Sequence, residues 1–170
     1  MENVSPSSIL NPDKDEYYML EAIKLATRAE DDGDVPIGAC IVYGERIIAR
    51  AWNQRELLQD PTAHAEMIAL TQASEHIGSW RLHGCTMYVT LEPCSMCAGA
   101  MVLARMDRLV YGCRDPKTGA VGSLYNIVQD DRLNHRLEVR EGVLAEPCSL
   151  MLSDFFRRRR EQKARENKDN

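Results

Sequence analysis

The stretch PTAHAEMIAL, residues 61–70, combines the start of a helix with two ionisable side chains. A Pro-Thr pair is typical of a helix entry, and apolar residues follow it at helical spacing. His64 and Glu66 lie two positions apart, and side chains at positions i and i+2 do not face each other on a helix. Burial would cost both groups free energy unless partners stabilised them. A metal ion over the N-terminal end of the helix would let both side chains reach one cavity.

A second stretch, LEPCSMCAGAM, residues 91–101, supplies two thiols directly after a Pro that ends an apolar strand. Cys94 and Cys97 have the i, i+3 spacing of side chains that share one helix face. They also lie in the first turn, where free backbone N–H groups and the helix dipole favour thiolate. Two thiolates in this arrangement suit zinc. A redox dithiol is the alternative, but no thioredoxin-like pattern surrounds the pair.

Together, His64, Cys94 and Cys97 make three protein ligands for zinc. A structural zinc site closes with four protein ligands, whereas a catalytic site keeps the fourth position for water. No other Cys or His lies at ligand spacing to these motifs, so the count favours catalysis, with Glu66 as the general acid/base. Taken singly, the alternative is a core histidine and a glutamate that caps its helix. The two motifs in combination favour the metal site.

Length and composition indicate a single globular domain. The 170 residues are enough for one domain with a core, and we expect a flexible polar leader over 1–14 and a single domain over 15–165 with a basic end to its last helix. No apolar run reaches transmembrane length and the N-terminus lacks a signal-peptide pattern, so we expect a cytoplasmic protein without a membrane partner. The four remaining cysteines lie in apolar segments typical of a reduced core.

The charge of the chain is unevenly distributed. The net charge is −5, yet residues 157–170 hold seven Lys/Arg and three Asp/Glu. A basic C-terminal arm on an acidic body is the asymmetry expected of a protein that touches a polyanion at one end. The alternative is a solvated helix end whose cations suit the helix dipole.

The order of apolar segments and turn signals predicts an α/β fold. We expect a helix over 11–33, a β-hairpin over 35–53, a helix over 62–78, a strand over 85–93 and a buried helix over 94–106. A strand over 108–113, a polar Gly-containing loop over 114–126, a strand over 135–143 and a long helix from about Glu146 follow. This alternation predicts one mixed sheet with helices on both faces.

The motifs also carry a family resemblance. HAE followed by PCSMC resembles the signature of the zinc-dependent nucleobase deaminases. The segments DPTAHAEMIAL, YVTLEPCSMCAGAM, RDPKTGAVGSL and MLSDFFRRRR are similar to those of the bacterial tRNA-specific adenosine deaminases, over roughly residues 15–160. The resemblance implies a three-layer α/β/α cytidine-deaminase-like fold with a central mixed five-stranded sheet. It also implies a homodimer that converts the wobble adenosine of a tRNA anticodon stem-loop to inosine.

Residue by residue, the resemblance implies His64, Cys94 and Cys97 as ligands of one Zn²⁺, Glu66 as the proton shuttle and Asn53 as a contact to the target base. Aromatic and basic side chains that can stack on splayed bases or take phosphates are predicted RNA contacts: Arg114, Lys117, Phe156, Arg157 and Arg160. One residue of the Phe155–Phe156 pair is expected to pack in the core instead.

Two other functions share part of this pattern. A deaminase of free guanine, cytosine or cytidine would have the zinc motif but no use for a basic aromatic arm. A zinc-stabilised RNA-binding module without catalysis would have no need of Glu66.

Overall fold

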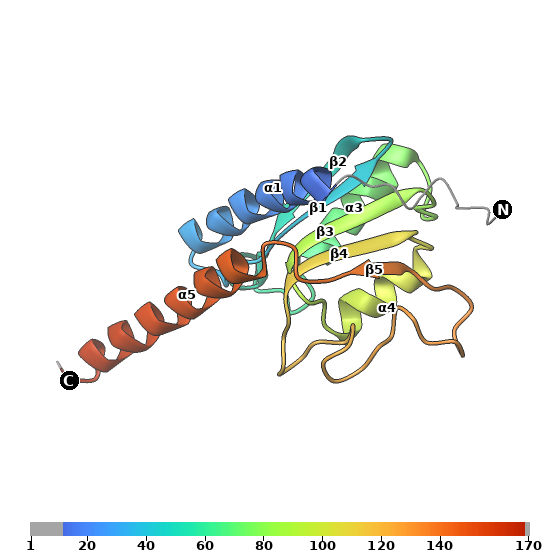
Figure 1. Ribbon diagram of the computed structural model, residues 1–170. Helices are drawn as coiled ribbons and strands as arrows, with labels where there is room; N and C mark the ends of the chain where they lie inside the picture. The colour runs from blue at the N-terminus through green and yellow to red at the C-terminus, as the bar shows by residue number, and fades with distance from the viewer. Residues whose placement is uncertain (1–11, 169–170) are drawn as a thin grey trace.

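The computed structural model describes residues 12–168, in which a five-stranded sheet lies between two layers of helices (Figure 1). The strands are β1 (Gly38–Tyr43), β2 (Arg46–Trp52), β3 (Cys85–Leu91), β4 (Arg108–Cys113) and β5 (Glu138–Arg140), in the order β2-β1-β3-β4-β5. β1 pairs antiparallel with β2 and β3, whereas β3, β4 and β5 run parallel. The sheet is mixed, as the sequence predicted.

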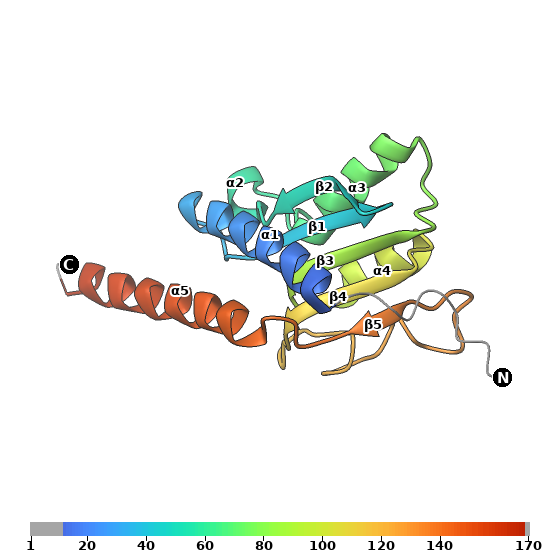
Figure 2. The ribbon, with the colours of Figure 1, turned by 45° about the horizontal axis from the view of Figure 1, so that its top comes forward.

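The helices divide between the two faces of the sheet (Figures 1 and 2). α1 (Pro12–Asp31) and α5 (Ala145–Glu166) cover one face, and α3 (Ala65–Ile77) and α4 (Ser95–Leu103) cover the other. A short helix α2 (Arg55–Leu58) follows β2. Both views show α5 running out beyond the edge of the sheet, which leaves its basic second half largely exposed.

Strand alternation gives each face of the sheet its own core. On β1, Ala39 and Ile41 pack toward α3 and α4, while Cys40 and Val42 pack toward α1 and α5. Both faces are covered, so the central strands read as nearly continuous apolar runs rather than alternating ones. Cys40, Cys85, Cys113 and Cys148 are all buried free thiols, which confirms their prediction as core residues.

A buried ion-pair network connects α1 to the sheet. Asp15 is fully buried, and its carboxylate accepts two hydrogen bonds from Arg108 on β4 at 2.9 and 3.0 Å and one from the Tyr88 hydroxyl on β3 at 2.7 Å. Arg140 on β5 donates to the same carboxylate. A buried charge is tolerated only when it is paired and hydrogen-bonded, so this one side chain joins one helix to three strands.

The structure differs from the sequence prediction in three places. α2 was not predicted. The last strand covers three residues instead of 135–143, because it pairs only with β4 and the chain leaves extended conformation at Gly142, whose φ is 81°. The first helix, predicted over 11–33, is α1 over Pro12–Asp31, and residues 1–11, most of the expected leader over 1–14, lie outside the described part of the chain. No helix within residues 12–168 combines the length and apolarity needed to span a bilayer.

We expect Asp15→Asn to lower the free energy of unfolding by about 3 kcal/mol at neutral pH, because it removes the buried charge that pairs with Arg108 and leaves that guanidinium only its bond to Glu138 at 3.1 Å. Burial alone would raise the pKa of Asp15, but hydrogen bonds from Arg108, Tyr88 and Arg140 outweigh it and lower that pKa. The stabilisation is thus complete above the ordinary pKa of about 4 and is lost as the pH falls through the lowered pKa. Urea unfolding of both proteins across this range measures the difference, which should shrink in acid; a constant difference would contradict the assignment.

Candidate metal centre and active site

Three side chains that are far apart in sequence meet at one point of the structure. The Nδ1 atom of His64 lies 3.6 Å from Sγ of Cys94 and 3.7 Å from Sγ of Cys97. All three donor atoms lie within 4.8 Å of one another, and within residues 12–168 this is the one His/Cys/Asp/Glu group with such geometry. The structure therefore brings together the three predicted zinc ligands.

Helix starts position these ligands. His64 is the residue immediately before α3 and has extended backbone angles (φ −72°, ψ 149°), and Cys94 stands in the same relation to α4 (φ −73°, ψ 175°). Cys97 lies in the first turn of α4. Because His64 itself is not helical, it need not share a helix face with Glu66, which answers the spacing problem in the sequence. The two helix N-termini also present positive dipole ends to the thiolates.

The donor set fits a tetrahedral zinc ion. Zinc binds histidine nitrogen at about 2.0–2.1 Å and thiolate at about 2.3 Å, so a tetrahedral angle separates these donors by about 3.6 Å. The N···S distances of 3.6 and 3.7 Å agree with this separation. One nitrogen and two sulfurs leave a fourth position open, which is the pattern of a catalytic zinc site rather than a structural one.

The electrostatics of the cluster suit metal binding. A hydrogen bond from Cys97 and one from His64 outweigh burial and lower the pKa of Cys94 to about 4. The hydrogen bond to Cys94, together with burial, raises the pKa of Cys97, so the two thiols share one proton until a metal ion displaces it. Cys94 is therefore a thiolate at neutral pH, the form that binds metal. Burial raises the pKa of the adjacent Glu66 carboxyl to about 7. Glu66 is only 4% exposed, and a carboxyl group with such a pKa exchanges protons readily at neutral pH.

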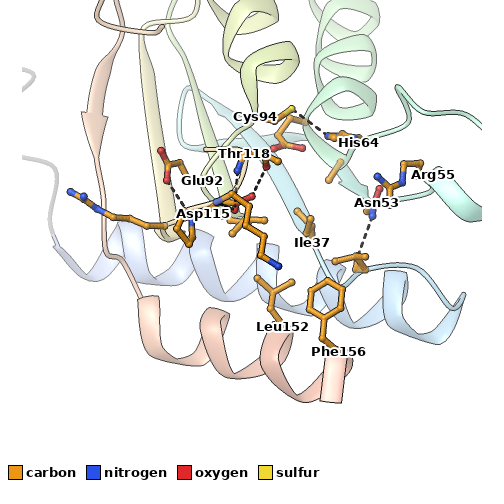
Figure 3. A pocket seen from close by; sticks show the side chains of 17 residues that line it. Ile37, Asn53, Arg55, His64, Glu92, Cys94, Asp115, Thr118, Leu152 and Phe156 are labelled. Carbon is orange, nitrogen blue, oxygen red and sulfur yellow. Dashed lines mark hydrogen bonds between the residues drawn. The ribbon is translucent and has the colours of Figure 1, made fainter. Parts of the chain in front are cut away.

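The metal cluster opens into a cavity of about 380 Å³ (Figure 3). Its walls come from the segment before β1, the segment after β2, the N-terminus of α3, the end of β3 with the start of α4, the loop after β4 and one face of α5. The lining residues are Val35, Ile37, Asn53, Arg55, His64, Ala65, Glu66, Leu91, Glu92, Cys94, Arg114, Asp115, Pro116, Lys117, Thr118, Leu152 and Phe156.

Asn53 contributes an unsatisfied acceptor to this cavity. Its side chain is 5% exposed and its Nδ2 donates to the carbonyl of Val35 at 3.3 Å, while its backbone N–H donates to Ile37 at 3.0 Å. Its Oδ1 is buried and has no hydrogen-bond partner within the described residues. An unpaired buried acceptor costs about 1–3 kcal/mol, and a hydrogen-bond donor placed beside this atom would remove that cost.

The predicted RNA-contact residues separate into two groups. Arg114, Lys117 and Phe156 line the cavity, and Phe156 is 42% exposed while its neighbour Phe155 is 8% exposed in the core. Arg157 and Arg160 lie farther along α5 and do not line it. Arg157 pairs with Asp154 at 3.2 Å and Glu161 at 3.8 Å, so part of its charge is already neutralised within the helix.

Arg55 and Glu92 are among the lining residues that the sequence did not identify. Arg55 begins α2 and lies beside Asn53 and His64 at the rim (Figure 3). Glu92 directly precedes Pro93 in the second motif, but nothing in the motif itself assigned it a role. That Glu92 is buried beside the metal ligands is visible only in the structure, because the spacing of His and Cys residues says nothing about it.

Comparison with known proteins agrees with this geometry. The cytidine and deoxycytidylate deaminase zinc-binding region matches residues 12–113. A tRNA-specific adenosine deaminase of Bacillus subtilis (strain 168) is 54% identical over 156 residues, which are 91% of this chain and 97% of that protein. The chain belongs to the tRNA-specific adenosine deaminase family. This membership confirms the resemblance of the HAE and PCSMC motifs.

The structure is also similar to solved structures of deaminases. A structure from a study of A-to-I editing by tRNA:A34 deaminases is 41% identical, with a TM-score of 0.77 over 80% of this chain and 99% of that one. A guanine deaminase of Bacillus subtilis is 37% identical, with a TM-score of 0.57 over 58% of this chain and 64% of that one. The tRNA deaminase therefore matches nearly end to end, whereas the guanine deaminase shares a smaller part. The three-layer cytidine-deaminase-like fold is confirmed.

We expect Cys97→Ala to lose most of its bound zinc, because two ligands hold the metal far more weakly than three. Elemental analysis of the purified protein measures about one zinc per chain in the wild type and little in the variant. Cys113→Ala is the matched control, because Cys113 is also a buried thiol but is outside the cluster. Equal zinc content in all three proteins would show that the metal binds elsewhere.

Proposed function

We propose that this protein is a zinc-dependent hydrolase that deaminates the wobble adenosine of a tRNA anticodon, releasing inosine in the RNA and ammonia. The observation that carries the proposal is a group of three metal donors with an open fourth position beside one cavity, which two of the donors line together with the buried carboxylate Glu66 and the unpaired acceptor Asn53 Oδ1. Membership of the tRNA-specific adenosine deaminase family supports the choice of substrate.

His64, Cys94 and Cys97 would hold the zinc ion. When bound, zinc supplies a nucleophile at neutral pH by lowering the pKa of water to about 7. Glu66 takes a proton from the attacking water and gives it to ring N1 of the base while the new C–O bond forms at C6. Glu66 then carries the second water proton to the amine, the C6–N6 bond breaks, and ammonia leaves. The product keeps the oxygen at C6 and the proton at N1, which is inosine.

Asn53 orients the base in this scheme. Its Nδ2 donates one hydrogen bond to the carbonyl of Val35, and its Oδ1 has no partner among the described residues, so Oδ1 accepts a hydrogen bond from an N–H or O–H of the target nucleotide. A base must leave its stack to enter such a cavity, and extrusion costs least from an unpaired loop such as an anticodon.

The flanking nucleotides meet the rim of the cavity. Phe156 offers an aromatic face for a splayed base, and Lys117 offers a cation for phosphates, as does Arg55 on the opposite side. Arg114 also lines the cavity, but its guanidinium donates two hydrogen bonds to Glu141, so part of its charge is already neutralised. Arg157 and Arg160 then follow along α5 as contacts for more distant backbone. A free nucleobase carries no phosphate, so these groups support an RNA substrate.

We further propose that the active species is a cytoplasmic homodimer. The family resemblance implies the dimer, and several large apolar side chains are available to be covered by a second copy, among them Leu103 (69% exposed) and Tyr125 (63% exposed). Light scattering on the purified protein measures its mass directly.

The substrate assignment makes a direct prediction. Purified protein should release ammonia and form inosine with an anticodon stem-loop that carries adenosine at the wobble position. It should be at least a hundredfold less active on free guanine, cytosine and cytidine, because these lack the phosphates that the rim contacts. A protein that prefers a free base or nucleoside would be a small-molecule deaminase instead, and one that binds the stem-loop without forming inosine would be a binding module.

We expect Glu66→Gln to keep about one zinc per chain and to lose at least a hundredfold in kcat, since general acid/base groups contribute roughly 10²–10⁴. Glutamine has the shape of glutamate but cannot relay a proton. Glu75→Gln is the control, because Glu75 is on the same helix but exposed near its far end. Inosine formation at near-native rate by Glu66→Gln would remove Glu66 from the mechanism.

A further inference from the structure

Glu92 is a buried carboxylate that the proposed reaction does not use. It lies between the end of β3 and the ligand Cys94, and it is 2% exposed. It belongs neither to the metal-donor group nor to the Asp15 network. A buried charge at this position requires an explanation, because it must be balanced by hydrogen bonds.

The donors to Glu92 all come from one loop. Its Oε1 accepts the backbone N–H groups of Val121 and Ser123, each at 3.0 Å. Its Oε2 accepts the N–H of Asp115 at 2.9 Å and the hydroxyl of Ser123. Four donors from residues 115–123 therefore converge on one carboxylate. Three of them are backbone N–H groups, which most substitutions in the loop would not remove.

The loop is also pressed against Glu92 along its backbone. A Cβ atom on Gly119 would lie 2.4 Å from Cδ of Glu92, so only glycine allows this approach. Ala120 donates its N–H to the carbonyl of Pro93 at 2.8 Å, and Gly119 forms a β-bridge with Cys94. Segment 92–94 is thus joined to the loop at several points, with the carboxylate at the centre.

The other side of the same loop forms a wall of the cavity (Figure 3). Lys117 and Thr118 face the cavity from a turn that the Asp115 carboxylate closes, accepting the N–H of Lys117 at 2.9 Å and that of Thr118 at 3.3 Å. Both residues are exposed. The position of this wall relative to the metal ligands therefore depends on the connection through Glu92.

We propose that Glu92 is a positioning residue that fixes loop 114–123 at the mouth of the cavity and so sets the affinity for the nucleotides that flank the target base. It acts through Lys117 and its neighbours on the phosphate and ribose groups of single-stranded RNA, and it leaves the chemical step unchanged. This inference rests on the proposed RNA substrate and deepens it, because it separates substrate affinity from the metal-centred reaction.

The first test is Glu92→Gln, in which the amide replaces one acceptor oxygen by a donor that faces N–H groups. The KM for the anticodon stem-loop should rise at least about tenfold, as expected for lost hydrogen bonds to a buried charge. The kcat should stay within about threefold and zinc content should not change. An unchanged KM, or a loss of zinc, would overturn the proposal.

A double-mutant cycle with Lys117→Ala separates positioning from general destabilisation. Lys117→Ala should raise KM in the wild type but have little further effect in Glu92→Gln, because Lys117 is then already displaced. Independent effects add, whereas coupled ones do not. Asp15→Asn is the matched control, because it also removes a buried carboxylate but on the other face of the sheet. It should leave KM unchanged by itself, and Lys117→Ala should raise KM by the same factor with or without it. Additive behaviour of Glu92→Gln would contradict positioning.

Hydrogen exchange gives a readout that does not require activity. The amide protons of Asp115, Val121 and Ser123 should exchange faster in Glu92→Gln, while that of Ile41 on β1 should not. If the wild type deaminated no RNA, the proposed function would fail, and unchanged exchange at these three amides would separately refute the anchoring role. Should Glu92→Gln fail to fold, Ser123→Ala removes only the hydroxyl donor and should show the same changes at smaller size; no change would count against Glu92.

Discussion

The meeting of two helix N-termini at the end of β3 is the constraint on which the site depends. His64 and Cys94 precede α3 and α4, so neither ligand is held by helical backbone geometry alone. Their positions follow from the packing of both helices on one face of the sheet, through residues such as Ala69 and Ala98 whose small side chains permit close approach. A metal bridge between the two helix starts would in turn fix that packing, since binding free energy and folding free energy are linked.

Much of this arrangement could be predicted from the sequence because its signals are local. Apolar runs bounded by turn residues identified the central strands, and the spacing within HAE and PCSMC identified the metal donors. The type and number of the ligands indicated the kind of site, since three ligands with a nearby carboxylate suit a catalytic zinc site. The structure adds the distances and the cavity, and family membership supports the reaction.

The parts that escaped prediction depend on contacts between distant residues. α2 is held by the Asp34 carboxylate, which lies 22 residues before Glu56 and accepts the N–H groups of Glu56 and Leu57 at 3.1 Å. No cap precedes that helix in the local sequence, so no start signal exists. Glu92 likewise owes its role to Val121 and Ser123, about thirty residues downstream. In both cases one buried carboxylate accepts hydrogen bonds from a segment that lines the cavity. The spacing of apolar residues in the sequence does not reveal these contacts.

The pair Phe155–Phe156 shows how such distant contacts decide function. Consecutive residues on a helix point about 100° apart, so only one ring can face the core, and the sequence does not say which. The packing of α5 on β4, with Cys148 buried in the core between them, sets the rotation of the helix. Phe155 then becomes part of the core and Phe156 reaches the cavity. The proposed chemistry thus depends on helix starts fixed by the sheet, whereas the proposed recognition of RNA depends on a loop that hydrogen-bonds to the buried Glu92 and on one face of α5.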